Sequence, residues 1–207
     1  MKKRYLLMTA VLLAGLLAAC AEKGPILLNV SYQEPEVKPT ASKATVVVSP
    51  LIDKRGKPAS ILGLRTIPDD LQNDLVVQDT VAAMATEQLK KAFQARGIAV
   101  KDAGEWNLTA EGLKTQGTGL LIGGEITTLW IDSKAATFKT NMKSTVKLKI
   151  VAADRSEKKI IRTIDVSSSL EEDVLYSREK LEQTLSNALS AAIDQIFKDE
   201  ELKKRLQ

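Results

Sequence analysis

The chain has no histidine in its 207 residues and a single cysteine, Cys20. The lack of histidine excludes Ser-His-Asp and Cys-His nucleophilic sites, as well as zinc sites built on imidazole. One cysteine allows no disulfide within the chain, so the fold must rest on its apolar core. Neither a Gly-rich phosphate loop nor a His-Glu-x-x-His motif is present. The sequence therefore predicts a protein that is not an enzyme, with no catalytic residues, no metal site and no cofactor.

The chain also lacks an apolar run long enough for a comfortable membrane span. Its N-terminal run, residues 5–17, is shorter than the roughly 20 residues that a spanning helix needs. This run follows the basic stretch Lys2-Lys3-Arg4, and small residues lead from it to Cys20. That layout predicts a secretory signal peptide over residues 1–19.

The stretch Leu17-Ala18-Ala19-Cys20 resembles a bacterial lipobox. The resemblance implies that Cys20 is acylated as the first mature residue and anchors the chain in membrane lipid. Ala21, not an aspartate, follows the cysteine, which by resemblance to lipoprotein sorting in enteric-type bacteria implies the outer membrane, facing the periplasm. Two alternatives are a free thiol behind an ordinary cleaved signal and an uncleaved anchor helix. The place of the cysteine argues against the first, and the polar stretch from Glu22 against the second.

The charge balance gives no footprint for nucleic acid. The 30 basic residues become 27 once Lys2, Lys3 and Arg4 leave with the signal, against 26 acidic ones. The remaining length suits one domain and a tether. Residues 20–43 contain three prolines and are predicted to form an extended tether that holds the domain off the membrane. Residues 44–207 are predicted to form a single periplasmic α/β domain, although the apolar residues 26–30 could instead pair as an edge strand.

Two amphipathic helices are predicted from apolar side chains at helical spacing. The first covers residues 74–95, with Asn73 or Asp74 as its N-cap and Gly97 as the left-handed residue after it. The second covers residues 178–198, with Ser177 as its N-cap. Asp199 can cap a short final helix that carries Leu202 and Leu206.

Strands are predicted at residues 45–49, 98–100, 120–131, 138–151 and 159–169. In the third segment, a period of two puts four side chains on one face: Leu120, Ile122, Ile126 and Trp130. In the fourth, the side chains that face the core are Phe138, Met142, Val146, Leu148 and Ile150. The expected fold class is a two-layer α+β or α/β fold, with a mixed β-sheet of about five strands and two amphipathic helices packed on one face.

The order of these elements is similar to that of a known family. The features that carry the similarity are the lipobox, a helix that ends in Phe93-Gln94-Ala95-Arg96-Gly97, the Gly124-Glu125-Ile126 strand, the long hairpin and the C-terminal helix. They resemble the YajG-like lipoproteins of Gram-negative bacteria over residues 28–205. The resemblance implies a lipoprotein of the cell envelope and carries no activity.

A row of lysines is the candidate interaction surface: Lys139, Lys143, Lys147 and Lys149 alternate with apolar residues. Such a row can contact anionic lipid headgroups or an acidic partner. The alternative, which we favour, is a solvated face whose lysines oppose edge-to-edge aggregation.

Three further features have structural explanations that outweigh functional ones. Glu125 could be an acid in a cleft with a perturbed pKa. The simpler interpretation is that it faces solvent or pairs with a lysine of the next strand. The neighbouring Gly123-Gly124 pair would permit close helix packing or a bulge. Ser156 with Lys159, and Ser177 with Lys180, have a Ser-x-x-Lys spacing, but turn and cap roles are favoured because the other motifs of that enzyme class are missing.

The expected function is a membrane-anchored, non-enzymatic binding or scaffold module of the cell envelope, with an envelope protein as partner. The alternative is an auxiliary lipoprotein subunit of an envelope transport complex, of ABC type or for lipid. A long apolar cavity between sheet and helices would favour transport, whereas a filled core with a surface groove would favour the scaffold.

Overall fold

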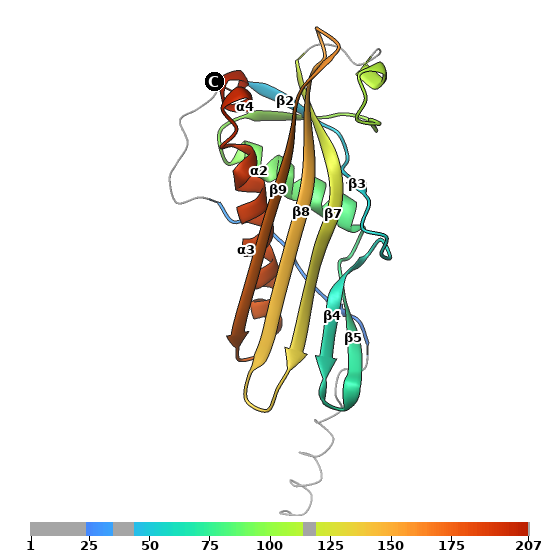
Figure 1. The fold of residues 1–207 in the computed structure, drawn as a ribbon, viewed down its shortest axis with the longest axis vertical. Helices are drawn as coiled ribbons and strands as arrows, with labels where there is room; N and C mark the ends of the chain where they lie inside the picture. Colours follow the sequence, from blue (N-terminus) through green and yellow to red (C-terminus); the bar gives the residue numbers. More distant parts are fainter. Residues whose placement is uncertain (1–23, 35–43, 114–118, 207) are drawn as a thin grey trace, which may run out of the picture.

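The computed structural model describes residues 24–34, 44–113 and 119–206, so Cys20 and the lipobox lie outside the described residues. The fold is α+β, with a mixed nine-stranded sheet and three α-helices in the described part of the chain (Figure 1). The strands are β1 (Ile26–Leu27), β2 (Thr45–Val48), β3 (Ile52–Asp53), β4 (Ile61–Ile67), β5 (Leu71–Val76), β6 (Ala99–Asp102), β7 (Leu120–Ala135), β8 (Thr140–Asp154) and β9 (Lys159–Val174). The helices are α2 (Val81–Gln94), α3 (Arg178–Ile196) and α4 (Glu200–Arg205). The prediction of two layers is confirmed, whereas the estimate of about five strands is wrong.

Three long antiparallel strands, β7, β8 and β9, form the frame of the sheet. With 16 residues, β7 runs for about 50 Å at about 3.3 Å per residue. Along its other edge the short strands β2, β3 and β4 follow one another, all parallel to it. Four strands add to the predicted five. β1 and β3 have two residues each, too few for a periodic pattern, whereas β4 and β5 form a hairpin that the sequence pattern did not predict.

The core lies between the sheet and helices α2 and α3, which cover one face (Figure 1). Ser177 caps α3 as predicted, because its hydroxyl accepts a hydrogen bond from the Lys180 amide. The buried stripe of α3 matches the prediction: Leu181, Leu185, Ala188, Leu189, Ala192, Ile193 and Ile196. Asp199 caps α4 as predicted, and Leu202 is buried against the same core. No helix of the described residues is long and apolar enough to cross a membrane.

The predicted start of the first helix is wrong. Residues 71–76 form β5, which pairs antiparallel with β4, and Asp74 is an exposed strand residue. The helix begins at Val81, because Thr80 takes the N-cap position and accepts a hydrogen bond from the Ala83 amide at 3.1 Å. Pairing with β4 overrides the helical spacing of the residues before Thr80. The predicted end is confirmed, since Gly97 adopts a φ of 72° just after the helix.

Two predicted core positions are corrected by irregularities in the long strands. A register shift between Ile126 and Thr128 inverts the alternation of β7. Leu129 and Ile131 therefore enter the core, and Trp130 points to the other face. Phe138 is 85% exposed because the chain turns between β7 and β8 before the strand begins.

The segment 24–34, which was assigned to the tether, packs on the domain. Ile26 and Leu27 pair parallel with β5, as the edge-strand alternative allowed. Ile26, Leu28, Val30 and Tyr32 are buried in the main core. Side chains of the helices accept hydrogen bonds from the backbone amides of this segment, Ser190 from Gln33 and Gln88 from Tyr32 among them. The packed domain therefore includes residues well before 44.

Candidate binding surface on the open sheet face

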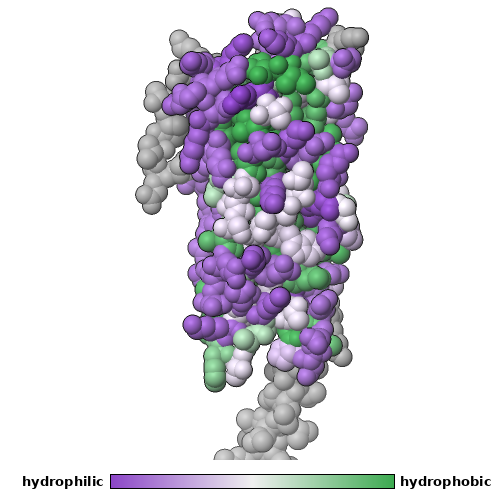
Figure 2. Space-filling view, in the orientation of Figure 1, coloured by the Kyte–Doolittle hydropathy of each residue, from purple (hydrophilic) through white to green (hydrophobic). Residues whose placement is uncertain are grey.

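The helices leave one face of β7, β8 and β9 uncovered, and exposed polar side chains of these strands lie on it. Figure 2 shows hydrophilic and intermediate colours over its middle, with hydrophobic patches toward the upper end. At that end a second, smaller cluster covers the sheet: Val47, Trp106, Leu113, Leu121, Val151 and Ala153. The middle and lower parts of the face carry charged, hydroxyl and aromatic side chains.

The lysine row is divided by the structure. Lys143, Lys147 and Lys149 are exposed on β8, where their neighbours in sequence are buried, so the predicted alternation is confirmed for them. Lys139 lies in the turn before β8, at the lower end of the sheet. The row is therefore three lysines on the face and one at its end.

Acidic residues of the neighbouring strands lie opposite two of these lysines. Lys143 stands between Asp132 of β7 and Glu171 of β9, and its Nζ lies 3.1 Å from the Glu171 carboxylate. The Lys143 ammonium, through its hydrogen bond, lowers the pKa of Glu171 below its usual value. Both side chains are 52% exposed, so solvent screens the pair.

Lys149 has the same kind of setting, opposite Glu125 on β7 and Asp165 on β9. Glu125 thus lies beside a lysine of the next strand, as the simpler interpretation held. Gly123, two positions before Glu125, has a role that was not predicted from the sequence. A Cβ at this position would lie 2.8 Å from the Trp106 ring. The glycine makes room for an indole of the second cluster.

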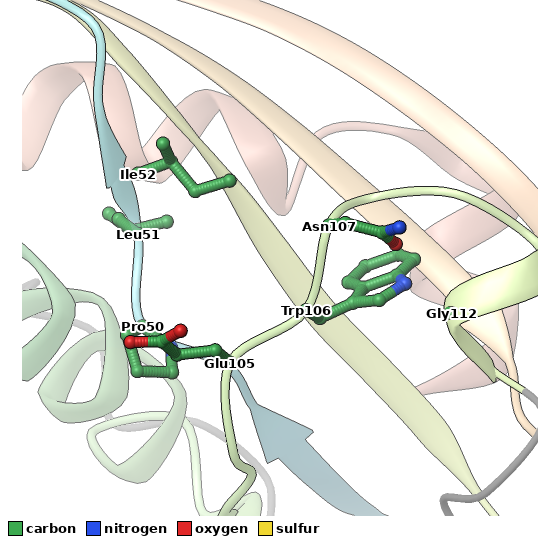
Figure 3. A pocket seen from close by; sticks show the side chains of 7 residues that line it. All are labelled: Pro50, Leu51, Ile52, Glu105, Trp106, Asn107 and Gly112. Carbon is green, nitrogen blue, oxygen red and sulfur yellow. The ribbon is translucent and has the colours of Figure 1, made fainter.

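A cavity of about 580 Å³ opens beside Trp106 (Figure 3). It lies between the β2–β3 connection, Pro50 to Ile52, and the segment that carries Glu105, Trp106 and Asn107. Trp106 itself is buried, and its indole nitrogen donates a hydrogen bond to the Thr109 carbonyl at 2.9 Å. The indole is thus satisfied within the protein, and this cavity offers one exposed charged group, Glu105, to a ligand.

A groove of about 590 Å³ lies at the middle of the open face. Its lining residues come from β4, β7, β8 and the β3–β4 connection: Arg55, Lys57, Leu64, Thr127, Thr128, Leu129, Trp130, Asp132, Thr145 and Lys147. Trp130 is half-buried, its indole donates to the Asp132 carboxylate at 3.0 Å, and the Lys57 ammonium lies 5.0 Å from the ring centre. The groove thus combines an aromatic surface with hydroxyl groups, the Asp132 carboxylate and two exposed lysines, Lys57 and Lys147, while the charge of Arg55 is paired with Asp53.

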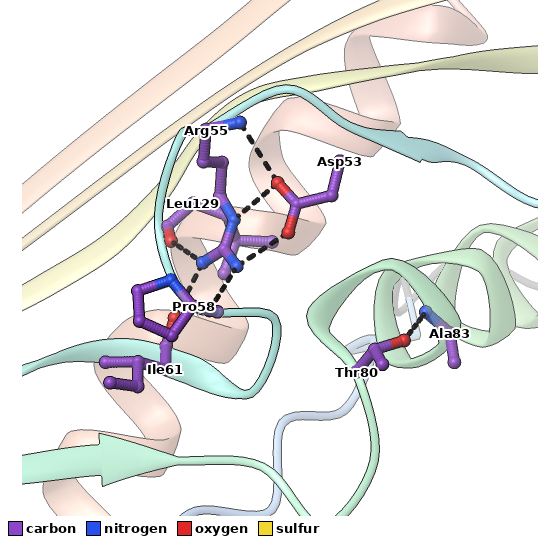
Figure 4. Close-up of polar contacts among 7 residues, drawn as sticks. All are labelled: Asp53, Arg55, Pro58, Ile61, Thr80, Ala83 and Leu129. Carbon is purple, nitrogen blue, oxygen red and sulfur yellow. Dashed lines mark hydrogen bonds and ion pairs between the residues drawn. The ribbon is translucent and has the colours of Figure 1, made fainter.

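The wall of this groove is held by Arg55 (Figure 4). Its guanidinium donates to both oxygens of Asp53, at 2.9 and 2.8 Å, and to the carbonyls of Ile61 and Leu129. Burial opposes ionisation of Asp53, but the hydrogen bonds from Arg55 outweigh it and lower the pKa of the carboxyl below its usual 3.8. Arg55 therefore ties the β3–β4 connection to β7 and fixes Lys57 near the indole.

This groove was not predicted from the sequence, because alternation along residues 120–131 places Trp130 on the core face. The sequence signal for the groove is Trp130 followed two positions later by Asp132, and this pattern is too common to predict a groove. The two Ser-x-x-Lys pairs serve as turn and cap: the Ser156 amide donates to Asp154, and Ser177 caps α3. Among the described residues no group of three or more acids or other ligands could hold a metal ion.

Comparison with known families shows the family to which this chain belongs. The model of the Lipoprotein_16 family, described as "Uncharacterized lipoprotein", matches residues 32–207. The chain belongs to this lipoprotein family. The expected resemblance to an uncharacterised bacterial lipoprotein family is thereby confirmed. The search of curated proteins gave no match for this lipoprotein.

Solved structures align with this lipoprotein at low sequence identity. Protein XCC0632 from Xanthomonas campestris aligns with a TM-score of 0.54 and 9% identity, over 87% of this chain and 95% of that one. Lipoprotein GNA1162 from Neisseria meningitidis aligns with a TM-score of 0.34 and 16% identity, over 75% of this chain and 99% of that one. The Xanthomonas protein shows a common fold.

Proposed function

We propose that this lipoprotein is a non-enzymatic binding or scaffold module of the cell envelope, anchored in the outer membrane by acylated Cys20, with its domain in the periplasm. The observation that carries the proposal is the coincidence of a lipobox-like stretch, Leu17-Ala18-Ala19-Cys20, with membership of a lipoprotein family. Ala21 after the cysteine supports the outer membrane. The anchor places the domain where an envelope protein can be its partner.

The filled core favours a scaffold over transport. The facing side chains of the sheet and α3, including Val146, Leu148, Leu185 and Leu189, are fully or almost fully buried in one cluster. The cavity beside Trp106 and the groove at Trp130 both open at the surface. The alternative of a transport subunit would need an apolar cavity between these layers to hold a lipid. A surface groove with an aromatic and two cations suits an acidic segment of a protein partner.

Lipidation is tested by Cys20→Ser in the native host with a labelled fatty acid. We expect this variant to carry no acyl label and to stay unprocessed, because the thiol that receives the lipid is gone. Normal incorporation of label into the variant would contradict the proposal.

The groove is tested by a photo-crosslinking residue at Thr145, with the same residue at the exposed Lys101 of β6 as control. We expect a discrete envelope adduct at Thr145 that is absent at Lys101 and lost when Trp130→Ala is added. Equal adducts at both positions, or an adduct that ignores Trp130→Ala, would show that the groove is not the binding surface.

A further inference from the structure

Exposed apolar side chains are concentrated at one end of the molecule. Of the five large hydrophobic residues exposed in the described part of the chain, four lie there: Phe138 (85% exposed), Leu175 (78%), Leu71 (55%) and Tyr176 (36%). We call these four the tip cluster. They stand on the β7–β8 turn, on the β9–α3 connection and at the start of β5.

Strand register brings these three segments to the same end. Thr66 of β4 pairs with Lys134 of β7, and Thr140 of β8 pairs with both Ala135 and Val174. All three connections lie at the lower end in Figure 1, and hydrophobic colour appears at the lower left end of the coloured surface in Figure 2. A cavity of about 390 Å³ is lined by Phe138, Leu175 and Tyr176 together, with the Arg65 guanidinium 3.6 Å from the Tyr176 ring centre.

The opposite end has a different character. The β8–β9 turn, at the top of Figure 1, is built from charged and polar side chains: Asp154, Arg155, Ser156, Glu157 and Lys158. Contiguous exposed apolar groups on a folded domain mark a surface that is covered in use. Because the apolar groups are exposed at one end only, we expect a specific surface to cover the tip cluster.

The length of chain between Cys20 and Gly24 limits how far this end of the domain can lie from a lipid attached to Cys20. The Gly24 carbonyl accepts a hydrogen bond from the side-chain amide of Asn73 at 2.9 Å, two positions from Leu71. β1 runs parallel to β5, so Gly24 lies at the end of its segment that is nearer to the tip cluster. Cys20 precedes Gly24 by four positions, which spans at most about 14 Å even when fully extended. A lipid attached at Cys20 cannot lie farther than this from Gly24.

We infer that the tip cluster rests on the lipid surface of the membrane in which Cys20 is anchored, so that the domain stands on the bilayer by this end. The inference rests on the proposed acylation of Cys20. It replaces the expectation of a long tether, because residues 24–34 pack on the domain and leave a short connection. A short connection keeps the local concentration of the tip at the surface high, so weak apolar contacts suffice.

The contact is apolar in kind, because charges of both signs share this end. Asp69 and Asp70 lie in the β4–β5 connection, and Arg65 and Lys139 lie near the cluster. Opposite charges cancel much of the attraction to an anionic surface. Contact with vesicles of zwitterionic phosphatidylcholine should therefore be as strong as with anionic ones, and it should persist at salt concentrations that shorten the Debye length to about 3 Å.

The test uses the mature acylated protein in phosphatidylcholine vesicles that contain brominated lipid as a quencher. Acylation consumes Cys20, so a cysteine introduced by Thr137→Cys or Glu157→Cys is the only free thiol and takes one fluorescent probe. We expect the probe at 137 to be quenched about two-fold more strongly than the probe at 157, because interfacial apolar groups enter the bilayer by roughly 5–10 Å. Adding Phe138→Ser with Leu175→Ser should abolish the difference. The matched control Leu27→Ser, which removes an exposed leucine outside the cluster, should leave it unchanged.

Flotation with the vesicles separates the two proposals. An acylated chain that does not float would overturn the anchor and the tip contact together. A chain that floats, but whose probes at 137 and 157 are quenched equally, would overturn the tip contact and leave the anchor in place. Shielding of position 137 only in native envelopes would assign the tip cluster to a protein partner and also overturn the inference.

Discussion

At the scale of single residues, Gly124 shows how tightly the strands of the frame pack. A Cβ built on it would lie 2.3 Å from the Lys149 carbonyl oxygen of β8, and backbone cannot move aside as a flexible side chain can. We expect Gly124→Ala to lower the free energy of unfolding by about 1–3 kcal/mol through overpacking. Urea denaturation would measure the change. Gly104→Ala, where the added carbon meets no atom within 4 Å, is the control, and an equal effect of both would refute this explanation.

Tyr32 joins the N-terminal segment to both helices. Its hydroxyl donates to Asp194 of α3 at 2.6 Å and accepts from Arg96, after α2, at 2.7 Å. Tyr32→Phe leaves the Arg96–Asp194 ion pair in place and removes hydrogen bonds to charged groups. We therefore expect a loss of about 1.5–3 kcal/mol in the free energy of unfolding.

The same hydroxyl predicts a pH dependence. Burial, followed by the hydrogen bond to Asp194, raises the pKa of Tyr32 from 10.0 to about 12. The unfolded chain therefore releases this proton at a lower pH than the folded chain does. Its contribution to stability is complete below pH 10 and is lost as the pH rises toward 12. The difference in stability between wild type and Tyr32→Phe should shrink over that range, and a constant difference would contradict the assignment.

At the scale of elements, α2 and α3 stabilise the fold by burying their apolar stripes. Phe93 and Leu189 are fully buried, and the Phe93 ring meets the Phe197 ring edge to face with centres 4.9 Å apart. We expect Phe93→Ala and Leu189→Ala each to cost about 2–5 kcal/mol by loss of burial and creation of a cavity. Thermal melts would measure this, with the exposed Lys91→Ala as control. Unchanged melting temperatures for both variants would mean that the helices do not pack on the sheet.

The start of α2 and the facing of side chains in β7 were predicted wrongly for the same reason. Residues 74–80 fit the start of a helix by spacing, yet β4 lies alongside and pairs with residues 71–76 as a strand. Trp130 fits the core by alternation, yet one extra residue in β7 moves it to the open face. In both places the deciding partner lies on another strand, so spacing along the local sequence cannot reveal it.

At the scale of the whole molecule, the lysine row belongs to a face of mixed charge. Acids of β7 and β9 stand opposite Lys143 and Lys149, so the face presents no single-sign field. We expect Lys143→Gln with Lys149→Gln, two exposed lysines that do not line the groove at Trp130, to change the free energy of unfolding by less than about 0.5 kcal/mol. Envelope partners, measured by crosslinking capture, should also persist. Loss of partners at unchanged thermal stability would show instead that the row is an interaction surface.

The sequence by itself determined the features that depend on neighbouring residues. Apolar spacing and hydrogen-bonding caps defined α3, and alternation defined the core face of β8, because these patterns act within one element. The lack of histidine limits the possible chemistry, and the lipobox-like stretch predicts the anchor from a few neighbouring residues. Only the tertiary structure decided that residues 24–34 pack on the domain, that Lys57 meets Trp130, and that Phe138 and Leu175 share one end. Each of these depends on register and packing between segments far apart in the chain, which no local pattern encodes.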